Sequence, residues 1–412
     1  MSTTLLGAAL RRYRRLGLGV RILLWMLLGV AAGLFFGPAT AIIAPIGALF
    51  IRLLMLAAVP LVLCNVVAGV AGLPDLRVLG RYGARTLVYY VGTSALALLV
   101  GVLVALWLQP GVGMRLTAPV AADFGQVPDL GDVLFGLVPE NIFAALAAGD
   151  VAQVVVFALL LGVAALSLPP DLKAPLRTGF DLAAQLLRRL VALIMRAGPL
   201  GVFALTATTV GEHGPGVFGP LSRFVATVWL AQALMVLLYM VLLRTFARRR
   251  PWPWLCQAGP VFATTAATCS SLASLAVALD VAETRLGLPH RVYSFTLPLG
   301  AQLNKDGTAI MLAGILLFTA QAAGAQFSAG EILAIILVGL LLSEGSTGIP
   351  GGGMVIAFMF VDAFHLPLEI AAIVAGVYRL VDMGSTTVNV MGDLVWTTIL
   401  SRWDRADDPA PT

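Results

Sequence analysis

Charged residues are scarce in this sequence, and so are the motifs that could build a disulfide framework or a hydrolytic site. Only 11% of the 412 residues are charged and 59% are hydrophobic, whereas about 25% of the residues of an average soluble protein are charged. The three cysteines predict no disulfide framework. The sequence contains no Walker A motif and no G-x-S-x-G nucleophile elbow. These absences argue against a soluble protein, against ATP-driven transport within this chain, and against an intramembrane hydrolase with Ser270 or Ser271 as nucleophile.

Six apolar stretches are long enough for a helix to cross a bilayer core, which takes roughly 20 residues. They cover residues 19–37, 43–71, 86–108, 142–167, 182–209 and 222–245. The 23 prolines and 43 glycines fit this interpretation, because neighbouring helices in a membrane satisfy the backbone groups that such residues free. The sequence therefore predicts an all-α polytopic membrane protein surrounded by a lipid bilayer.

Clusters of arginine and lysine predict the orientation of the chain. They precede the first apolar stretch and follow the second, fourth and sixth, so the positive-inside rule places the N-terminus and these loops in the cytoplasm. Arg402 and Arg405 place the C-terminus there as well. The net charge of +5 is not gathered into one basic and aromatic patch, so we expect no nucleic-acid partner. We expect a multi-pass protein of the inner or plasma membrane, and we do not interpret the first stretch as a removable signal peptide.

After Arg250 the pattern changes, because polar and small residues enter the middle of the apolar stretches. Residues 254–283 hold threonines and serines between two apolar arms, each too short to span a bilayer. Residues 331–361 repeat this pattern around the segment 343–353. Paired interrupted segments are typical of the binding site of a transporter. We interpret both as re-entrant helical hairpins, each followed by one long helix, 292–323 and 369–401.

Six ionisable residues lie inside these last apolar segments: Lys305, Asp306, Glu344, Arg379, Asp382 and Asp393. A charge at the bilayer centre costs roughly 2.5 to 3.5 kcal/mol even on the mildest scale. These residues therefore either pair with one another to hold the helices together or form a functional site. The segments 304–308 and 389–393 each place a carboxylate and amide oxygens beside a glycine. Hard cations prefer such oxygen ligands, which favours a cation site.

At these residues the sequence resembles the glutamate-transporter-like family of dicarboxylate/amino-acid:cation symporters. The resemblance is carried by FTLPLGAQLNKDGTAI in the first long helix, STGIPGGG in the second hairpin and VDMGSTTVNVMGDL in the last helix. It implies eight transmembrane helices plus two re-entrant helical hairpins, in a homotrimer that works by an elevator mechanism. It also implies a scaffold formed mainly by residues 1–253, a core transport domain over residues 254–402, and a polar tail over residues 403–412. Within the first part, the stretch 86–108 would contribute to the transport core.

The resemblance further implies two sodium sites, for which all ligands are present. One would be formed by Tyr90, Thr93, Ser94, Asn304 and Asp306, and the other by Gly300, Asn304, Asn389 and Asp393. The six ionisable residues above carry four negative and two positive formal charges. Two monovalent cations would neutralise the remainder if the substrate is a zwitterion. Protons in place of sodium are the alternative, because Glu344 could titrate.

A third cation site of the family would lie at Gln302, Lys305, Ser343, Glu344 and Ser346. This site is altered here, since Lys305 stands where the family has a methionine and Glu344 where it has an apolar residue. We expect an ion pair between these two side chains in place of a third sodium ion. Removal of one partner would leave a buried charge, at a cost of about 3 to 5 kcal/mol.

The resemblance also implies a set of substrate-binding residues: Ser270, Ser271, Thr308, Ile349, Gly353, Asp382, Ser385, Thr386 and Asn389. Asp382 would bind an amino group, and Asn389 with Thr308 the main-chain carboxylate. Members that take acidic substrates hold an arginine at the position of Ser385, and the planar fork of arginine suits a second carboxylate. The family's second arginine is also missing, because Cys269 or Met383 stands at its positions.

We therefore expect cation-coupled symport of a small neutral amino acid: alanine, serine, threonine or cysteine. The alternative is symport of an acidic amino acid or a C4-dicarboxylate, with sodium or protons. In that alternative Arg379 would bind the second carboxylate instead of pairing with Asp382 at i, i+3. An anion channel is a further alternative, which is disfavoured because the polar residues converge on one site rather than line a continuous stripe. The chain is not expected to be an enzyme.

Overall fold

The structure is a computed structural model, and it describes residues 18–71, 76–114, 138–148, 151–344 and 352–407. Within these ranges the chain is helical and contains no strand, which confirms the all-α prediction. The helices are α2 (Leu18–Phe36), α3 (Ala44–Ala71), α4 (Leu76–Leu108), α6 (Ile142–Ala148), α7 (Val151–Leu166), α8 (Pro170–Ile194), α9 (Gly198–His213), α10 (Phe218–Leu242), α11 (Pro251–Thr268), α12 (Ser271–Thr284), α13 (His290–Leu303), α14 (Asp306–Ala323), α15 (Ala329–Glu344), α16 (Gly352–Ala363), α17 (Leu368–Val374) and α18 (Tyr378–Asp407). Short 3₁₀ or π turns join some of them: η1 (Gly37–Ile43), η2 (Met195–Ala197), η3 (Gly214–Val217) and η4 (Leu243–Ala247).

Four helical stretches in the described ranges are long and apolar enough to cross a bilayer: Val20–Leu53, Gly83–Leu108, Gly214–Ala247 and His290–Ala323. A fifth results if Asp171–Ile194 and Gly198–Glu212, which are bent by 55° at their junction, count as one span. The predicted span over residues 182–209 therefore covers parts of two helices, α8 and α9. The chain bends at η2, and a new helix starts there because Pro199 suits the first turn of a helix. The stretch 142–167 likewise contains two helices, α6 and α7.

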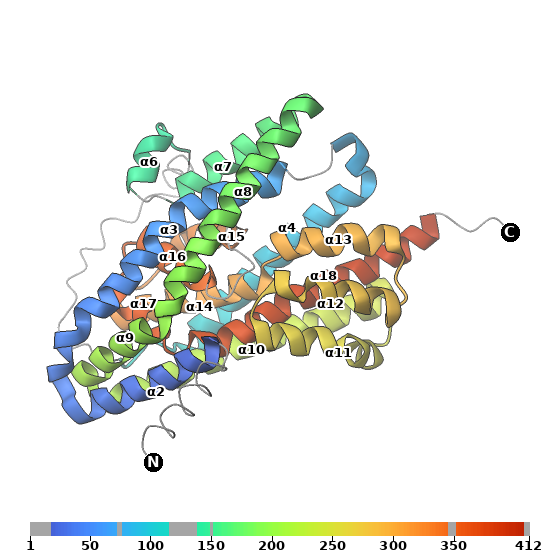
Figure 1. The fold of residues 1–412 in the computed structure, drawn as a ribbon. Coiled ribbons are helices and arrows are strands. Elements are labelled where there is room, and N and C mark those ends of the chain that lie inside the picture. The colour runs from blue at the N-terminus through green and yellow to red at the C-terminus, as the bar shows by residue number, and fades with distance from the viewer. Residues whose placement is uncertain (1–17, 72–75, 115–137, 149–150, 345–351, 408–412) are drawn as a thin grey trace, which may run out of the picture.

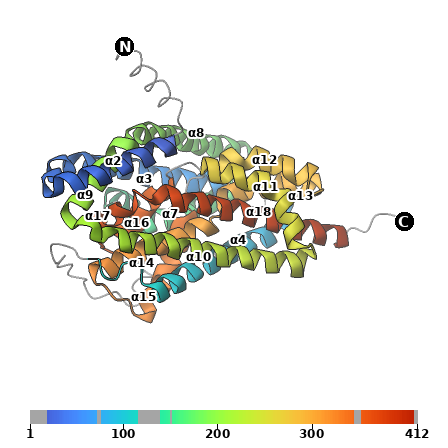
Figure 2. The same ribbon diagram turned by 90° about the horizontal axis from the view of Figure 1, so that it is seen from below.

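The first helices form one packed group. α2 packs along α9, and α3 packs against α7, α8 and α9. Small residues allow this approach: a Cβ on Gly29 would lie 2.8 Å from the main-chain oxygen of Phe203, and one on Gly33 would lie 2.8 Å from that of Ala207. In both views α2 and α9 lie towards the left of the molecule, and α11, α12 and α13 towards the right (Figures 1 and 2).

A second group surrounds α14. This helix packs against α4, α10, α16 and α18, so nearly all its residues are buried. A helix that is apolar all round is expected inside a protein rather than at its surface. α10 packs on α4, α14 and α18; the stretch 222–245, which the sequence placed with the scaffold, therefore belongs by its contacts to this second group.

Two helix pairs match the ranges of the expected hairpins. α11 and α12 pack side by side and are joined at Cys269 and Ser270. Cys269 has a φ of +49°, and the Oγ of Ser270 accepts a hydrogen bond from Ala273 N at 3.1 Å, so this turn is sharply defined. α15 and α16 form the second pair, and residues 345–351 between them lie outside the described ranges.

The two helices predicted to follow the hairpins are both interrupted, so their prediction as single continuous helices is wrong. The first ends at Leu303 and resumes at Asp306, because Asn304 adopts an extended conformation with φ −88° and ψ 114°. The second is divided by a turn into α17 and α18. The interruption at Asn304 provides the polar backbone groups and side chains of the site described below.

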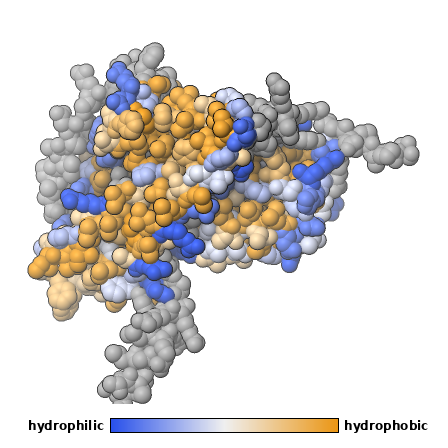
Figure 3. Space-filling view, turned by 45° about the horizontal axis from the view of Figure 1, so that its top comes forward, coloured by the Kyte–Doolittle hydropathy of each residue, from blue (hydrophilic) through white to orange (hydrophobic). Residues whose placement is uncertain are grey.

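Large apolar side chains cover much of the outer surface. Figure 3 shows them over a broad part of one face, and exposed examples include Phe35, Ile42, Val88, Trp107 and Phe143. Apolar patches of this extent are rare on monomeric soluble proteins. They are the surface that a bilayer would cover.

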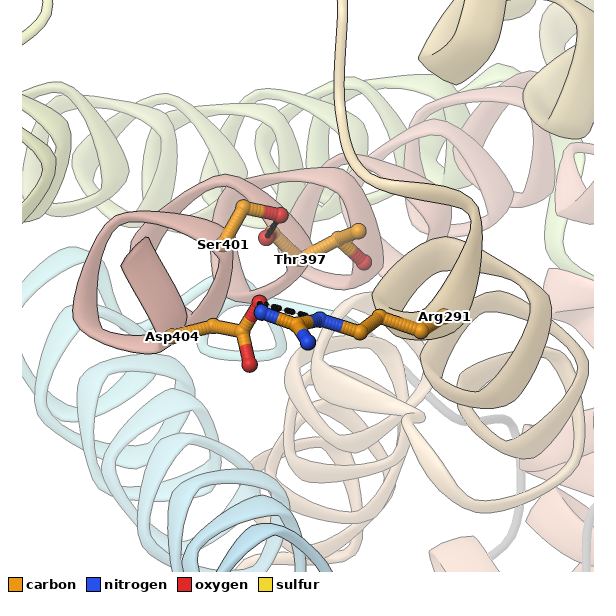
Figure 4. A network of polar contacts seen from close by, with 4 residues as sticks. All are labelled: Arg291, Thr397, Ser401 and Asp404. Atoms are coloured by element: carbon orange, nitrogen blue, oxygen red, sulfur yellow. Dashed lines mark hydrogen bonds and ion pairs between the residues drawn. The ribbon is translucent and has the colours of Figure 1, made fainter. Parts of the chain in front are cut away.

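An ion pair joins the beginning of α13 to the end of α18 (Figure 4). Arg291 donates through Nε and Nη2 to Oδ2 of Asp404, at 2.7 Å each. The Asp404 side chain is 1% exposed and the Arg291 side chain 57% exposed. On the same stretch of α18, Ser401 donates to the main-chain oxygen of Thr397 at 2.7 Å. The ion pair between Arg291 and Asp404 thus links α13 to α18, the helices that carry much of the site described below.

Candidate functional site

The break between α13 and α14 places Asn304 against α18. Asn304 is fully buried, and its Nδ2 donates to the main-chain oxygen of Asn389 and to Oδ1 of Asp393, both at 2.9 Å. Its Oδ1 accepts no hydrogen bond from any described residue. A buried amide oxygen without a donor is costly, and a hard cation would satisfy it together with the carboxylate of Asp393.

Gly300 makes room for this corner of the site. A Cβ on Gly300 would lie 2.2 Å from Oδ1 of Asp393 and 2.6 Å from the hydroxyl oxygen of Tyr90. The main-chain oxygen of Gly300 accepts from Asn304 N at 2.8 Å. The structure thus brings together the four residues expected at one sodium site: Gly300, Asn304, Asn389 and Asp393.

Asp306 begins α14, and both of its carboxylate oxygens accept hydroxyl hydrogens. Ser94 of α4 donates to Oδ1 at 2.7 Å, and Tyr239 of α10 donates to Oδ2. Thr93 and Tyr90 donate to main-chain oxygens, at 3.2 Å and 3.0 Å, which leaves lone pairs of their hydroxyls for a cation. The ligands expected at the other sodium site therefore come together at the contact of α4 with the start of α14.

Within the described residues, no three His, Cys, Asp or Glu side chains gather closely enough to hold a metal ion. A cation beside Asp306 and Asp393 would be bound by hydroxyl, amide and main-chain oxygens in addition to the carboxylates. This oxygen set suits a hard cation such as sodium rather than zinc or copper.

Two polar residues of α10, Tyr239 and Gln232, belong to the site and were not singled out from the sequence. They lie seven residues apart in the apolar stretch 222–245 and face α14 and α18. A Cβ on Gly392 would lie 2.6 Å from the hydroxyl oxygen of Tyr239, so α18 approaches this tyrosine closely. A polar residue inside an apolar span is the signal that could have identified both.

Asn389 connects the cation corner to the first turn of α14. Its Oδ1 accepts from Gly307 N at 2.7 Å and from Thr308 N at 3.3 Å, and its Nδ2 donates to Thr308 Oγ1 at 3.1 Å. Gly307 allows this close approach, because a Cβ there would lie 2.1 Å from the main-chain oxygen of Ser385. The amide end of a helix carries a positive partial charge, which suits a substrate carboxylate near Thr308.

Lys305 is buried at the helix break with 1% of its surface exposed. Its Nζ donates to the main-chain oxygen of Ala301 at 2.8 Å, at the carbonyl end of α13, where the partial charge of the helix is negative. The ammonium also acts electrostatically on the carboxylate of Asp393. Lys305 is thus a fixed cation beside the site.

The rest of the expected third cation site is only partly described. Ser343 is fully buried and donates to the main-chain oxygen of Leu340 at 2.9 Å, and Gln302 is half-buried. The side chain of Glu344 and residue Ser346 lie outside the described residues. The ion pair between Lys305 and Glu344 therefore stays a prediction.

Asp382 lies buried near the start of α18, and the guanidinium of Arg379 and the thiol of Cys269 are among the groups that act on its carboxylate. Arg379 donates through Nη2 to the main-chain oxygen of Ala267 at 2.7 Å. No ion pair joins Arg379 to Asp382 in this described region, so the expected i, i+3 pair is wrong. The physical reason is that the first hairpin offers a main-chain acceptor to the guanidinium.

Both hairpins contact residues near Asp382. Ser270 and Ser271 are buried at the turn of the first hairpin. Gly353 of the second lies against α18, since a Cβ there would be 2.7 Å from the hydroxyl oxygen of Tyr378. The expected contact of Ile349 lies outside the described residues.

The hydroxyl of Ser385 is directed towards α10. It donates to the main-chain oxygen of Val381 at 3.0 Å and accepts from Nε2 of Gln232 at 3.0 Å. Thr386, the next residue, is buried one turn after Asp382. The residue expected to decide substrate selectivity is therefore engaged by a neighbouring helix.

Comparisons with known proteins match nearly the whole chain. The model of the sodium:dicarboxylate symporter family matches residues 18–403. The proton/glutamate-aspartate symporter of Bacillus subtilis (strain 168) is 31% identical over 393 residues, covering 94% of each chain. The proton/sodium-glutamate symport protein of Bacillus caldotenax is 29% identical over 405 residues, covering 95% of each chain. The C4-dicarboxylate transport protein of Azorhizobium caulinodans is 29% identical over 395 residues, covering 93% of this chain and 88% of the relative.

Proposed function

Since the chain belongs to the sodium:dicarboxylate symporter family, we propose that it carries an acidic amino acid or a C4-dicarboxylate across the cell membrane together with a coupling cation. The relatives above are named for glutamate, aspartate or C4-dicarboxylates. Their names support the acidic alternative over the small neutral amino acid that the sequence favoured. As a member of a symporter family the chain is a multi-pass membrane transporter rather than an enzyme.

The observation that carries the coupling proposal is the unsatisfied amide oxygen of Asn304 beside Asp393. It is buried, it has no donor in the described part of the chain, and a carboxylate adjoins it. We assign the coupling cations to this corner and to the neighbouring corner at Asp306. Sodium at both places is the arrangement proposed; protons are the alternative that the names of the relatives keep open.

Arg379 supports an acidic substrate. Its Nη2 is held by the first hairpin, and arginine has five N–H donors in a rigid fork. The guanidinium therefore lies between the hairpin turn and α18, one turn before Asp382. We assign to Arg379 the binding of the second carboxylate, to Asp382 the binding of an amino group, and to Thr308 with the first turn of α14 the binding of the main-chain carboxylate.

We also propose eight transmembrane helices plus two re-entrant hairpins, an elevator mechanism, a homotrimer and cytoplasmic termini. The separate packing of the α2, α3, α8 and α9 group supports a division into scaffold and transport domain. We propose that α4 and α10 belong to the transport domain, which their contacts with α14 support.

Uptake by purified protein in liposomes tests the function. Labelled aspartate, succinate and serine are each supplied with an inward sodium gradient, an inward proton gradient, or neither. We expect aspartate or succinate to accumulate only with a cation gradient, and Asp393→Asn to abolish the accumulation. Asp181→Asn is the matched control, because the Asp181 side chain is 43% exposed on α8 and pairs with Arg177.

Three results would overturn the proposal. Serine uptake without aspartate or succinate uptake would return the substrate to the small neutral class. Equal uptake with and without gradients would remove cation coupling. A current that needs no substrate would indicate a channel.

A further inference from the structure

Gln232 is a buried amide on the largely apolar helix α10. It lies in the middle of α10 with 4% of its surface exposed. Its Nε2 donates to Ser385 Oγ at 3.0 Å and to the main-chain oxygen of Val381 at 3.2 Å. Both amide hydrogens are therefore directed to one turn of α18.

Gly384 allows the amide to approach α18 this closely. A Cβ on Gly384 would lie 2.0 Å from Oε1 of Gln232 and 2.9 Å from its Cδ. Any other residue at this position would push the amide away from the helix. The contact thus depends on three residues: Gly384 and Ser385 of α18, and the long amide side chain of Gln232 from α10.

The contact determines what Ser385 can offer a substrate. Its single hydroxyl hydrogen is donated to Val381 at 3.0 Å, and Gln232 donates to its oxygen. Ser385 lies three residues after Asp382 and four before Asn389, so it shares a helix face with both. In this rotamer the hydroxyl hydrogen is held by the helix itself, and the amide of Gln232 holds the hydroxyl oxygen towards α10.

Gln232 is not needed to satisfy the serine. Ser401, on the same helix, donates to the carbonyl four residues earlier in the same way. A serine inside a helix commonly satisfies its hydroxyl by this bond alone. The amide from α10 adds a second constraint, which keeps the hydroxyl turned towards α10.

We propose that Gln232 determines specificity through Ser385. It holds the Ser385 hydroxyl towards α10 and so keeps it from binding a substrate. The stretch of α18 between Asp382 and Asn389 then gives a hydroxylated neutral amino acid no advantage over an acidic substrate. Gln232 is a positioning residue, since it acts through Ser385. The inference rests on the proposed function, in which Arg379 selects acidic over neutral substrates by binding their second carboxylate.

The test compares the KM values for aspartate and serine in proteoliposomes. Gln232→Leu has a similar volume and no amide, so the Ser385 hydroxyl becomes free to turn. We expect the KM for serine to fall about tenfold, the size of one neutral hydrogen bond, while the KM for aspartate stays within about twofold.

The double variant makes the test specific. With Ser385→Ala present, Gln232→Leu should no longer change the ratio of the two KM values. A parallel rise of both KM values in Gln232→Leu or an unchanged ratio would overturn the inference. If Gln232→Leu does not fold, Gln232→Met, alone and combined with Ser385→Ala, addresses the same question.

Failure of the proposed function gives a different result. If the unaltered protein takes up serine but not aspartate, the substrate assignment fails, while the change of the serine KM in Gln232→Leu still decides the role of Gln232. If it responds to none of the substrates, both proposals are wrong.

Discussion

Gly300→Ala is a perturbation whose effect at the cation site follows from distances. The added Cβ would lie 2.2 Å from Oδ1 of Asp393, 2.5 Å from its Cγ and 2.6 Å from the hydroxyl oxygen of Tyr90. Gly300 is a helical residue of α13 and has no positive φ. Because alanine is about 1 kcal/mol more favourable than glycine inside a helix, the backbone gives no reason for a loss.

The magnitude follows from what Asp393 has to give up. Its carboxylate must rotate away from the new methyl group, which breaks the 2.9 Å bond that it accepts from Asn304 Nδ2. Hydrogen bonds to charged groups contribute about 1.5 to 3 kcal/mol. If this geometry is needed for the cation, the sodium concentration for half-maximal uptake should rise by about tenfold to a hundredfold.

The assay is the sodium dependence of aspartate uptake in proteoliposomes, together with the sodium-dependent shift of the melting temperature of the purified protein. Gly92→Ala on α4 is the matched control, because a Cβ there would meet nothing within 4 Å. It should leave both measurements unchanged. A normal sodium dependence in Gly300→Ala would refute the assignment of the cation to Asp393, and a lower melting temperature without any sodium-specific change would indicate a packing defect only.

Further substitutions test the charged and hydroxyl groups around the site. Arg379→Lys keeps the charge but loses the planar fork, so the KM for aspartate should rise about tenfold while the serine KM stays constant; equal changes in both would contradict a carboxylate-binding role. Lys305→Met should abolish uptake more fully than Lys305→Met combined with Glu344→Ile, because the single change leaves an unpaired buried charge; equal losses in the two would exclude the ion pair. Tyr239→Phe should lower the free energy of unfolding by about 1.5 to 3 kcal/mol, because a buried carboxylate loses a donor. Tyr89→Phe is its control in the same denaturant titration, since the Tyr89 hydroxyl has no hydrogen-bond partner in the described region, and an equal loss in both would contradict the prediction.

The charged and interrupted part of the chain was largely readable from the sequence. Polar residues inside apolar runs are conspicuous, because a bilayer tolerates them only where they are buried or bound. For this reason Asn304, Asp306 and Asp393 could be expected at one site before their contacts were known. The pattern could not show that the helix stops at Asn304, since glycine and asparagine weaken a helix without fixing where it ends.

The orientation of side chains towards particular neighbours was not readable. Ser385 was expected to define the substrate, but which way its hydroxyl points depends on Gln232, a residue far away in sequence. Gln232 and Tyr239 gave no local indication of the helix that each contacts, because the faces of an apolar helix differ only through tertiary packing. The contacts of α10 with α14 and α18 could not be predicted from the sequence for the same reason.

Asn389 gives the coupling of the proposed function a short physical route. Its main-chain oxygen accepts from the amide of Asn304, which adjoins the cation corner, and its side chain holds the first turn of α14 at Gly307 and Thr308. A cation that binds Oδ1 of Asn304 would orient its side-chain amide. The Nδ2 of the same amide donates to the main-chain oxygen of Asn389. The side chain of Asn389 in turn holds the N-terminus of α14, where a substrate carboxylate would bind. Cation and substrate are therefore linked through one side chain and its own backbone, and each should raise the affinity for the other by the same factor.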